Sequence, residues 1–162
     1  MLEAFYATER GSLEDVTVNG GFDLHPEFVW IDLIAPTQEE QQWVYDAYTQ
    51  NLPTLKSLED ISSSARFYRD DDGILHISTY FLTKNKNYQV DPDVEDSSNM
   101  LATVQTVAFI LHKGRLFTLR GEILVAFRAF RARARRNDYD MDYKDPVWLL
   151  LGLLEAKLDE LA

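Results

Sequence analysis

VQTVAFILHKGRLFTLR, residues 104–120, consists of two apolar runs separated by the dipeptide Lys113-Gly114. Short runs rich in β-branched and aromatic residues, joined by a tight connection that contains glycine, predict the two strands of a hairpin. The central positions of both runs are mostly apolar, which is typical of strands in the middle of a sheet. We therefore expect an antiparallel strand pair in the middle of a sheet.

The sequence before this hairpin predicts five more strands. They are LEAFYAT (2–8), EDVTV (14–18), FVWIDLI (28–34), ARFYRD (65–70) and ILHISTYFL (74–82). The last two flank Asp70-Asp71-Asp72-Gly73, whose residue types suit a turn. Residues 83–101 are polar and acidic, so we expect a mobile surface loop there.

Capping signals and apolar spacing predict four helices. Thr37 and Glu40 match a capping box that opens the first helix, and a second, short helix is expected from Leu55 to Ile61. The third helix is expected from Glu122 onward. The expected apolar faces comprise Trp43, Val44, Ala47 and Tyr48 in the first helix and Ile123, Phe127, Phe130 and Ala134 in the third.

The last helix is expected to begin at Pro146, since proline is favoured in the first turn. Its residues Val147, Leu151, Leu154, Leu158 and Leu161 follow the spacing of a heptad seam. The order of elements is then β-β-β-α-α-β-β-β-β-α-α. It predicts an α/β fold in which a mixed sheet is sandwiched between helices.

Composition excludes several classes of function. The 162 residues include no cysteine and only three histidines, so thiolate metal sites, disulfides and a cysteine nucleophile are excluded. No apolar run reaches the roughly 18 residues that span a bilayer. The net charge of −11 argues against nucleic-acid binding. We expect a soluble, cytosolic chain and no enzyme, because no nucleophile–base pair or phosphate loop is visible.

Three acidic groups are candidates for metal binding. Asp70-Asp71-Asp72-Gly73 lacks the spacing of a calcium loop, so we interpret it as a solvated turn. The acids of residues 91–96 suit a disordered loop better than a magnesium site. Glu59 and Asp60 are different, because carboxylates near the negative end of a helix are unfavourable without a cation or a basic partner.

The sequence RAFRARARR, residues 128–136, is the one basic patch. A nucleic acid, an anionic lipid or an acidic protein would each fit such a patch. The alternative is a helix face paired with the surplus carboxylates of this chain. The net charge favours that alternative or a protein partner.

Three segments together resemble one family. VWIDLIAPTQEEQ (29–41), LEDISSSARFYRDDDGILHIS (58–78) and VAFILHKGRLFTLRGEILVAFRAFRARAR (107–135) resemble, in order and spacing, the amino-terminal cytoplasmic domain of CorA magnesium transporters of the proteobacterial type. The zinc transporter ZntB is related to the same family. The resemblance covers nearly the whole chain.

The resemblance implies an α/β/α regulatory domain over residues 1–145 and the beginning of a long stalk helix over residues 146–162. In the parent protein, two transmembrane helices with a Gly-Met-Asn pore motif would follow, assembled as a homopentamer in the bacterial inner membrane. The domain would lie on the cytoplasmic side and regulate transport of Mg²⁺, with Co²⁺ and Ni²⁺ as further ions.

The resemblance also implies a regulatory Mg²⁺ site between subunits, with Asp60 as a ligand and Glu59 as its helper. Mg²⁺ that bridges carboxylates of neighbouring subunits would hold the gate shut, and loss of the ion would let the subunits separate. We expect weak Mg²⁺ binding by the chain alone. The alternative function is an independent acidic adaptor that binds another protein through its arginine-rich helix and leucine seam.

Overall fold

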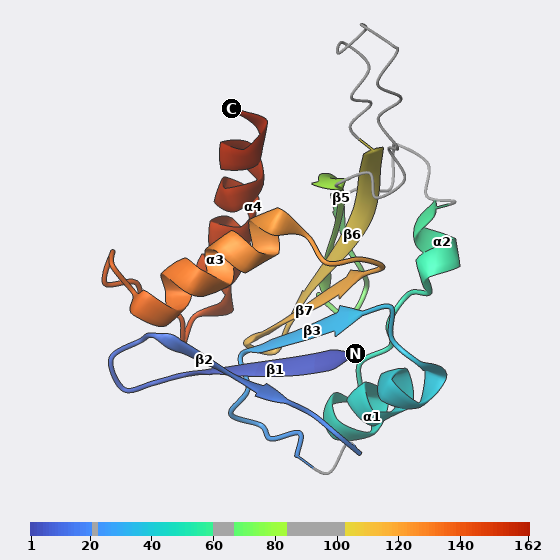
Figure 1. Cartoon of the computed structure of the whole chain (residues 1–162). Coiled ribbons are helices and arrows are strands. Elements are labelled where there is room, and N and C mark those ends of the chain that lie inside the picture. Colours follow the sequence, from blue (N-terminus) through green and yellow to red (C-terminus); the bar gives the residue numbers. More distant parts are fainter. Residues whose placement is uncertain (21–22, 60–66, 84–102) are drawn as a thin grey trace, which may run out of the picture.

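The computed structural model describes residues 1–20, 23–59, 67–83 and 103–162. Its centre is a seven-stranded sheet in the order β2-β1-β3-β7-β6-β5-β4 (Figure 1). The strands are β1 (Leu2–Ala7), β2 (Leu13–Thr17), β3 (Trp30–Ile34), β4 (Phe67–Arg69), β5 (Leu75–Thr83), β6 (Thr103–His112) and β7 (Arg115–Arg120). β3 and β7 run parallel and the other neighbouring pairs run antiparallel, so the sheet is mixed as predicted.

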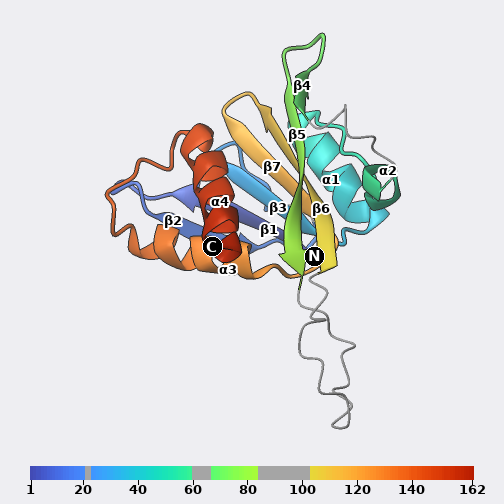
Figure 2. The ribbon, with the colours of Figure 1, turned by 90° about the horizontal axis from the view of Figure 1, so that it is seen from above.

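Helices cover both faces of the sheet (Figure 2). α1 (Gln38–Tyr48) and α2 (Leu55–Glu59) pack on one face, and α3 (Val125–Arg136) and α4 (Pro146–Leu161) pack on the other. The order of elements agrees with the predicted order, and the capping box of Thr37 and Glu40 is present. The α/β class with helices on both sides of a mixed sheet is therefore confirmed.

The predicted central hairpin is formed by β6 and β7. Ala108 pairs with Leu119, and His112 pairs with Arg115 next to the turn. Lys113 and Gly114 both have positive φ angles, 49° and 73°, as a two-residue type I′ turn requires. The hairpin lies between β3 and β5, where both of its faces are covered.

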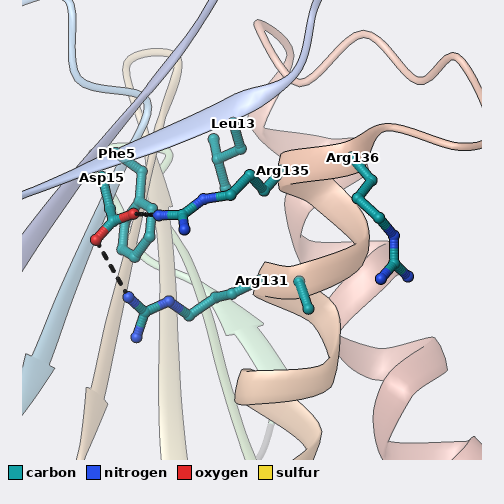
Figure 3. Close-up of a pocket in the computed structure, with 7 residues that line it drawn as sticks. Phe5, Leu13, Asp15, Arg131, Arg135 and Arg136 are labelled. Atoms are coloured by element: carbon teal, nitrogen blue, oxygen red, sulfur yellow. Dashed lines mark hydrogen bonds and ion pairs between the residues drawn. The ribbon is translucent and has the colours of Figure 1, made fainter.

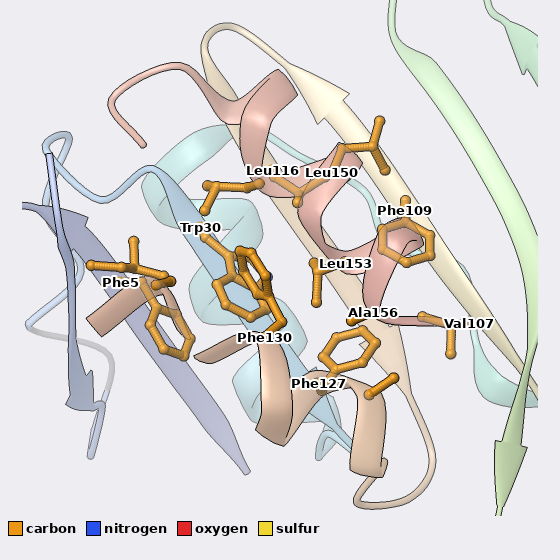
Figure 4. Packing of buried hydrophobic residues seen from close by; sticks show 14 of the residues in the cluster. Phe5, Trp30, Val107, Phe109, Leu116, Phe127, Phe130, Leu150, Leu153 and Ala156 are labelled. Atoms are coloured by element: carbon orange, nitrogen blue, oxygen red, sulfur yellow. The ribbon is translucent and has the colours of Figure 1, made fainter. Parts of the chain in front are cut away.

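α3 and α4 pack on the sheet through an aromatic core (Figure 4). Trp30 of β3 stacks on Phe5 of β1 with a ring separation of 4.2 Å, and Phe130 of α3 meets Trp30 edge-on at 5.8 Å. In α4, a Cβ atom at Gly152 would lie 2.3 Å from the Phe130 ring. The close contact of α3 with α4 therefore requires glycine at this position.

Two predictions of buried positions are wrong. Ile123 is 60% exposed, because α3 begins only at Val125 and the preceding Leu124 is the buried residue. Ala47 is exposed on α1, where Val44 is the fully buried side chain.

Some predicted boundaries also change. Thr83, predicted to lie in the loop, is the last residue of β5. The rest of the predicted loop, residues 84–101, lies outside the described residues, and so does Ile61 at the predicted end of the second helix.

α4 begins at Pro146, capped by Asp145, whose carboxylate accepts the amide proton of Val147. Its buried face consists of Pro146, Leu149, Leu150, Leu153 and Ala156. Leu154 of the predicted heptad seam is partly buried against the aromatic core. The other seam residues lie on an outer surface, where Leu151, Leu158 and Leu161 are 48%, 64% and 56% exposed. The role of α4 as the beginning of a stalk stays a prediction.

Candidate functional site

The predicted cation-binding segment lies at the end of α2. Thr54 and Ser57 cap the start of this helix with reciprocal backbone-to-side-chain hydrogen bonds of 3.0 and 3.1 Å. Leu58 is buried in the aliphatic core on the α1–α2 face. Because Leu58 fixes the rotation of the short helix, Glu59 is left exposed to solvent. Asp60, the other predicted ligand, lies outside the described residues.

Glu59 offers one exposed carboxylate to a cation. The last carbonyl groups of a helix carry negative partial charge, which favours a cation near its carboxyl end. Mg²⁺ needs only one or two carboxylates, because it keeps several of its water molecules. Among the residues that the structure describes, no three acidic or histidine side chains gather into a metal-binding group. Glu59 therefore supplies at most part of a site.

Asp70 has a structural role in the turn between β4 and β5. Its Oδ1 atom accepts the amide protons of Asp72 and Ile74, and its Oδ2 atom lies 2.9 Å from Nε2 of His76. The hydrogen bond from His76 lowers the pKa of the Asp70 carboxyl. Gly73 has a φ of 80°, which suits glycine. The interpretation of this segment as a turn is confirmed.

The arginine-rich helix α3 is paired with carboxylates of the same chain, as one of the two favoured interpretations predicted. Arg131 contacts Glu3 at 2.8 Å. It also contacts Asp15 at 3.4 Å, and Arg135 pairs with the same carboxylate (Figure 3). Two further pairs, Arg133–Asp159 and Arg136–Asp138, lie on other sides of the helix. Burial raises the pKa of Glu3 above its usual value, although Arg131 acts in the opposite direction.

A buried ion pair between β3 and β7 was not predicted. Asp32 is 0% exposed and Arg120 is 2% exposed, and the guanidinium donates to both carboxylate oxygens at 3.2 and 2.7 Å. Thr118 donates to the same carboxylate at 2.7 Å and accepts the indole proton of Trp30. The signal in the sequence was a charged residue inside the apolar run FVWIDLI. The network satisfies both charges and fixes the parallel pairing of the two strands.

Comparison with known proteins identifies the family. The family model of "CorA-like Mg2+ transporter protein" matches residues 26–162. The magnesium transport protein CorA of Escherichia coli (strain K12) is 43% identical over 134 residues, which are 83% of this chain and 38% of that protein. The protein of the same name from Mannheimia succiniciproducens is 40% identical over the same shares. The chain therefore spans well under half the length of these relatives.

Solved structures show the same fold. The ZntB cytoplasmic domain from Vibrio parahaemolyticus superposes with a TM-score of 0.56 at 16% identity, covering 97% of this chain and 57% of that one. The CorA magnesium transporter from Methanocaldococcus jannaschii superposes with a TM-score of 0.65 at 12% identity. The match covers 97% of this chain and 44% of that one. None of the described helices combines the length and the hydropathy of a transmembrane span. The extent of the family match and the identity to its members show that this chain belongs to the CorA-like Mg²⁺ transporter family.

Proposed function

We propose that this chain is the cytoplasmic, cation-sensing regulatory domain of a CorA-type transporter for Mg²⁺, with Co²⁺ and Ni²⁺ as further ions. The observation that carries the proposal is membership of a transporter family, with relatives named magnesium transport proteins at 40% and 43% identity. Since the chain corresponds to 38% of those relatives, it would act as part of a longer protein on the cytoplasmic side of the bacterial inner membrane.

The proposed sensor consists of Glu59 and Asp60 facing a neighbouring copy. The exposure of Glu59 at the end of α2 supports this role, because an ion must reach the carboxylate without unfolding the helix. Hydrated Mg²⁺ would bridge carboxylates of two copies and offset their mutual repulsion. When the concentration of Mg²⁺ falls, the bridge is lost and the copies move apart. The state with bridged copies would be the closed one.

The outer face of α4 supports assembly of several copies, proposed here as a homopentamer. Leu151, Leu158 and Leu161 are between 48% and 64% exposed in the single chain. Their heptad spacing is that of helices that pack side by side. In the proposed assembly, the same seam on neighbouring copies covers these side chains.

A titration of the isolated chain with MgCl₂, followed by amide NMR, tests the sensor. We expect weak, saturable shifts centred on residues 57–60. The variant Glu59→Gln with Asp60→Asn should lose them, whereas Asp46→Asn, which removes an exposed carboxylate of α1, should keep them. Equal shifts in all three proteins would contradict the assignment of the site.

The exposed seam of α4 also favours a second candidate, an acidic adaptor that binds an unlike protein. The two candidate functions differ in which protein binds to the exposed leucines of α4. Association of the chain with itself, weakened by a charge at Leu158, is expected of a transporter subunit. A monomer that captures an unlike helix through the same residues would support the adaptor.

A further inference from the structure

The way in which α3 docks on the sheet changes along the helix. In its first half, Phe127 and Phe130 are buried in the aromatic core. In its second half, Ala134 is the one buried residue. There the contact with β1 and β2 is made by Arg131 and Arg135 instead (Figure 3). This half of the helix is therefore held by ion pairs in addition to the buried contact of Ala134.

Four side chains form a continuous ionic strap from β1 and β2 to α3. Glu3 of β1 contacts Arg131, Arg131 also contacts Asp15 of β2, and Asp15 pairs with Arg135. Along this path the side chains are 11% exposed for Glu3, 29% for Arg131, 22% for Asp15 and 67% for Arg135. Solvent and salt therefore reach the Asp15–Arg135 pair most easily and the Glu3–Arg131 pair least.

The ionic strap crosses a pocket of about 370 Å³ between α3 and the first two strands. Phe5 and Leu13 contribute apolar side chains to its lining, next to Asp15, Arg131 and Arg135 (Figure 3). Leu13 of β2 and Ala134 of α3 are buried in the same cluster, and Asn137 at the end of α3 donates to the carbonyl of Arg10. The ion pairs of Asp15 add to these contacts, so their loss should make local separation of the two elements easier.

α4 is bound to the same face in a different way. Leu149, Leu150 and Leu153 are buried against the sheet and α3. Apolar burial does not depend on ionic strength in the way that exposed ion pairs do. The two helices should therefore respond differently to salt, although they are neighbours.

We infer that the ionic strap of Glu3, Asp15, Arg131 and Arg135 controls a local opening of the protein. When its ion pairs are lost, the second half of α3 and β2 separate as one unit, while α4 and the β6–β7 hairpin stay packed. Opening would expose the pocket and its apolar lining. The inference does not require the proposed cation site, because it uses residues on the other face of the sheet.

Hydrogen exchange of backbone amides, measured by NMR on the whole chain at 20 mM NaCl, tests the inference. Asp15→Asn should lower the protection of residues 131–136 and 13–17 about tenfold, as expected for the loss of two partly exposed ion pairs. Protection of residues 149–156 should change less than about twofold, since separate cooperative units open independently. Asp159→Asn is the matched control, because it removes an ion pair from Arg133 of the same helix without touching the strap.

Two further measurements make the outcome decisive. Arg135→Gln should also lower the amide protection of residues 131–136 and 13–17. When it is added to the Asp15→Asn variant, it should lower this protection no further. Raising NaCl to 500 mM should weaken protection of the same residues, with MgCl₂ at equal ionic strength giving the same result. The inference is overturned if Asp15→Asn behaves like Asp159→Asn, if α4 loosens equally, or if MgCl₂ acts more strongly than NaCl.

Discussion

The two faces of the same sheet are built from different chemistry. Along β3, Ile31 and Leu33 point toward α1 and α2, where the buried cluster is largely aliphatic. The alternate residues Trp30 and Asp32 point toward α3 and α4, where the buried Asp32–Arg120 pair lies beside the ring of Phe127. An aliphatic face can tolerate small shifts of the helices on it, whereas paired charges and stacked rings accept few arrangements. The second face therefore fixes how α3 and α4 are oriented.

Removal of the Asp32 charge should give the largest effect on stability. Asp32→Asn leaves the Arg120 guanidinium buried without its counterion, and we expect the free energy of unfolding to fall by about 3–5 kcal/mol. Ile31→Val, on the aliphatic face of the same strand, should cost only about 0.5–1.5 kcal/mol. Urea denaturation measures both variants.

A double replacement sharpens this contrast. Asp32→Leu combined with Arg120→Met removes both charges and should recover most of the stability, because a buried ion pair gains little over apolar residues of similar size. Equal losses for Asp32→Asn and Ile31→Val would refute the proposed difference between the two faces.

A methyl group at position 152 should give the next largest effect. Gly152→Ala places a Cβ atom 2.3 Å from the Phe130 ring. We expect a loss of about 1–2 kcal/mol, since overpacking outweighs the gain in helix propensity. Thermal unfolding monitored by circular dichroism measures it. Adding Phe130→Leu to the Gly152→Ala variant should restore part of the lost stability. If it restores none, the strain does not come from the contact with the Phe130 ring.

The partly buried carboxyl of Glu3 should give a smaller, pH-dependent effect. Burial raises its pKa in the folded chain above the usual value of 4.5, so the folded chain binds this proton more readily than the unfolded chain does. Stability relative to Glu3→Gln should therefore fall as the pH rises from below 4.5 through the raised pKa. Urea unfolding at several pH values checks this. If the wild-type chain instead becomes more stable than Glu3→Gln as the pH rises, the attraction of Arg131 outweighs burial in setting the pKa of Glu3.

The smallest effect on stability is expected at the outer face of α4. Leu158→Glu should change the free energy of unfolding by less than about 0.5 kcal/mol, because the side chain is 64% exposed. It should nevertheless weaken self-association, which sedimentation over a range of concentrations measures. A wild-type chain that is monomeric at every concentration would contradict a role of the seam in assembly.

Local signals predicted most of the fold. The hairpin of residues 104–120 was predictable because two apolar runs and a glycine-containing turn lie next to each other in sequence. Periodicity failed at Ile123, because it does not mark where a helix begins. The turn at Asp70 and the capping box at Thr37 are both present, as their sequence patterns predicted.

Pairings between distant residues could not be predicted in the same way. Asp32 and Arg120 are separated by 88 positions and meet only because β3 and β7 pair in parallel. The partners of Arg131 likewise depend on how α3 crosses β1 and β2. Glu59 and Asp60 stood out in the sequence as carboxylates near a helix end, and their proposed role as metal ligands came from family resemblance. The structure places Glu59 on the surface and leaves their function as a proposal.

The central claim is that Glu59 and Asp60 sense Mg²⁺ for a transporter. Its most direct test is the Mg²⁺ flux through the full-length transporter that carries this domain, measured against the internal Mg²⁺ concentration. We predict that internal Mg²⁺ inhibits the wild-type protein and the Asp46→Asn control. The variant Glu59→Gln with Asp60→Asn should stay open at concentrations that close them. Unchanged inhibition of that variant would contradict the claim.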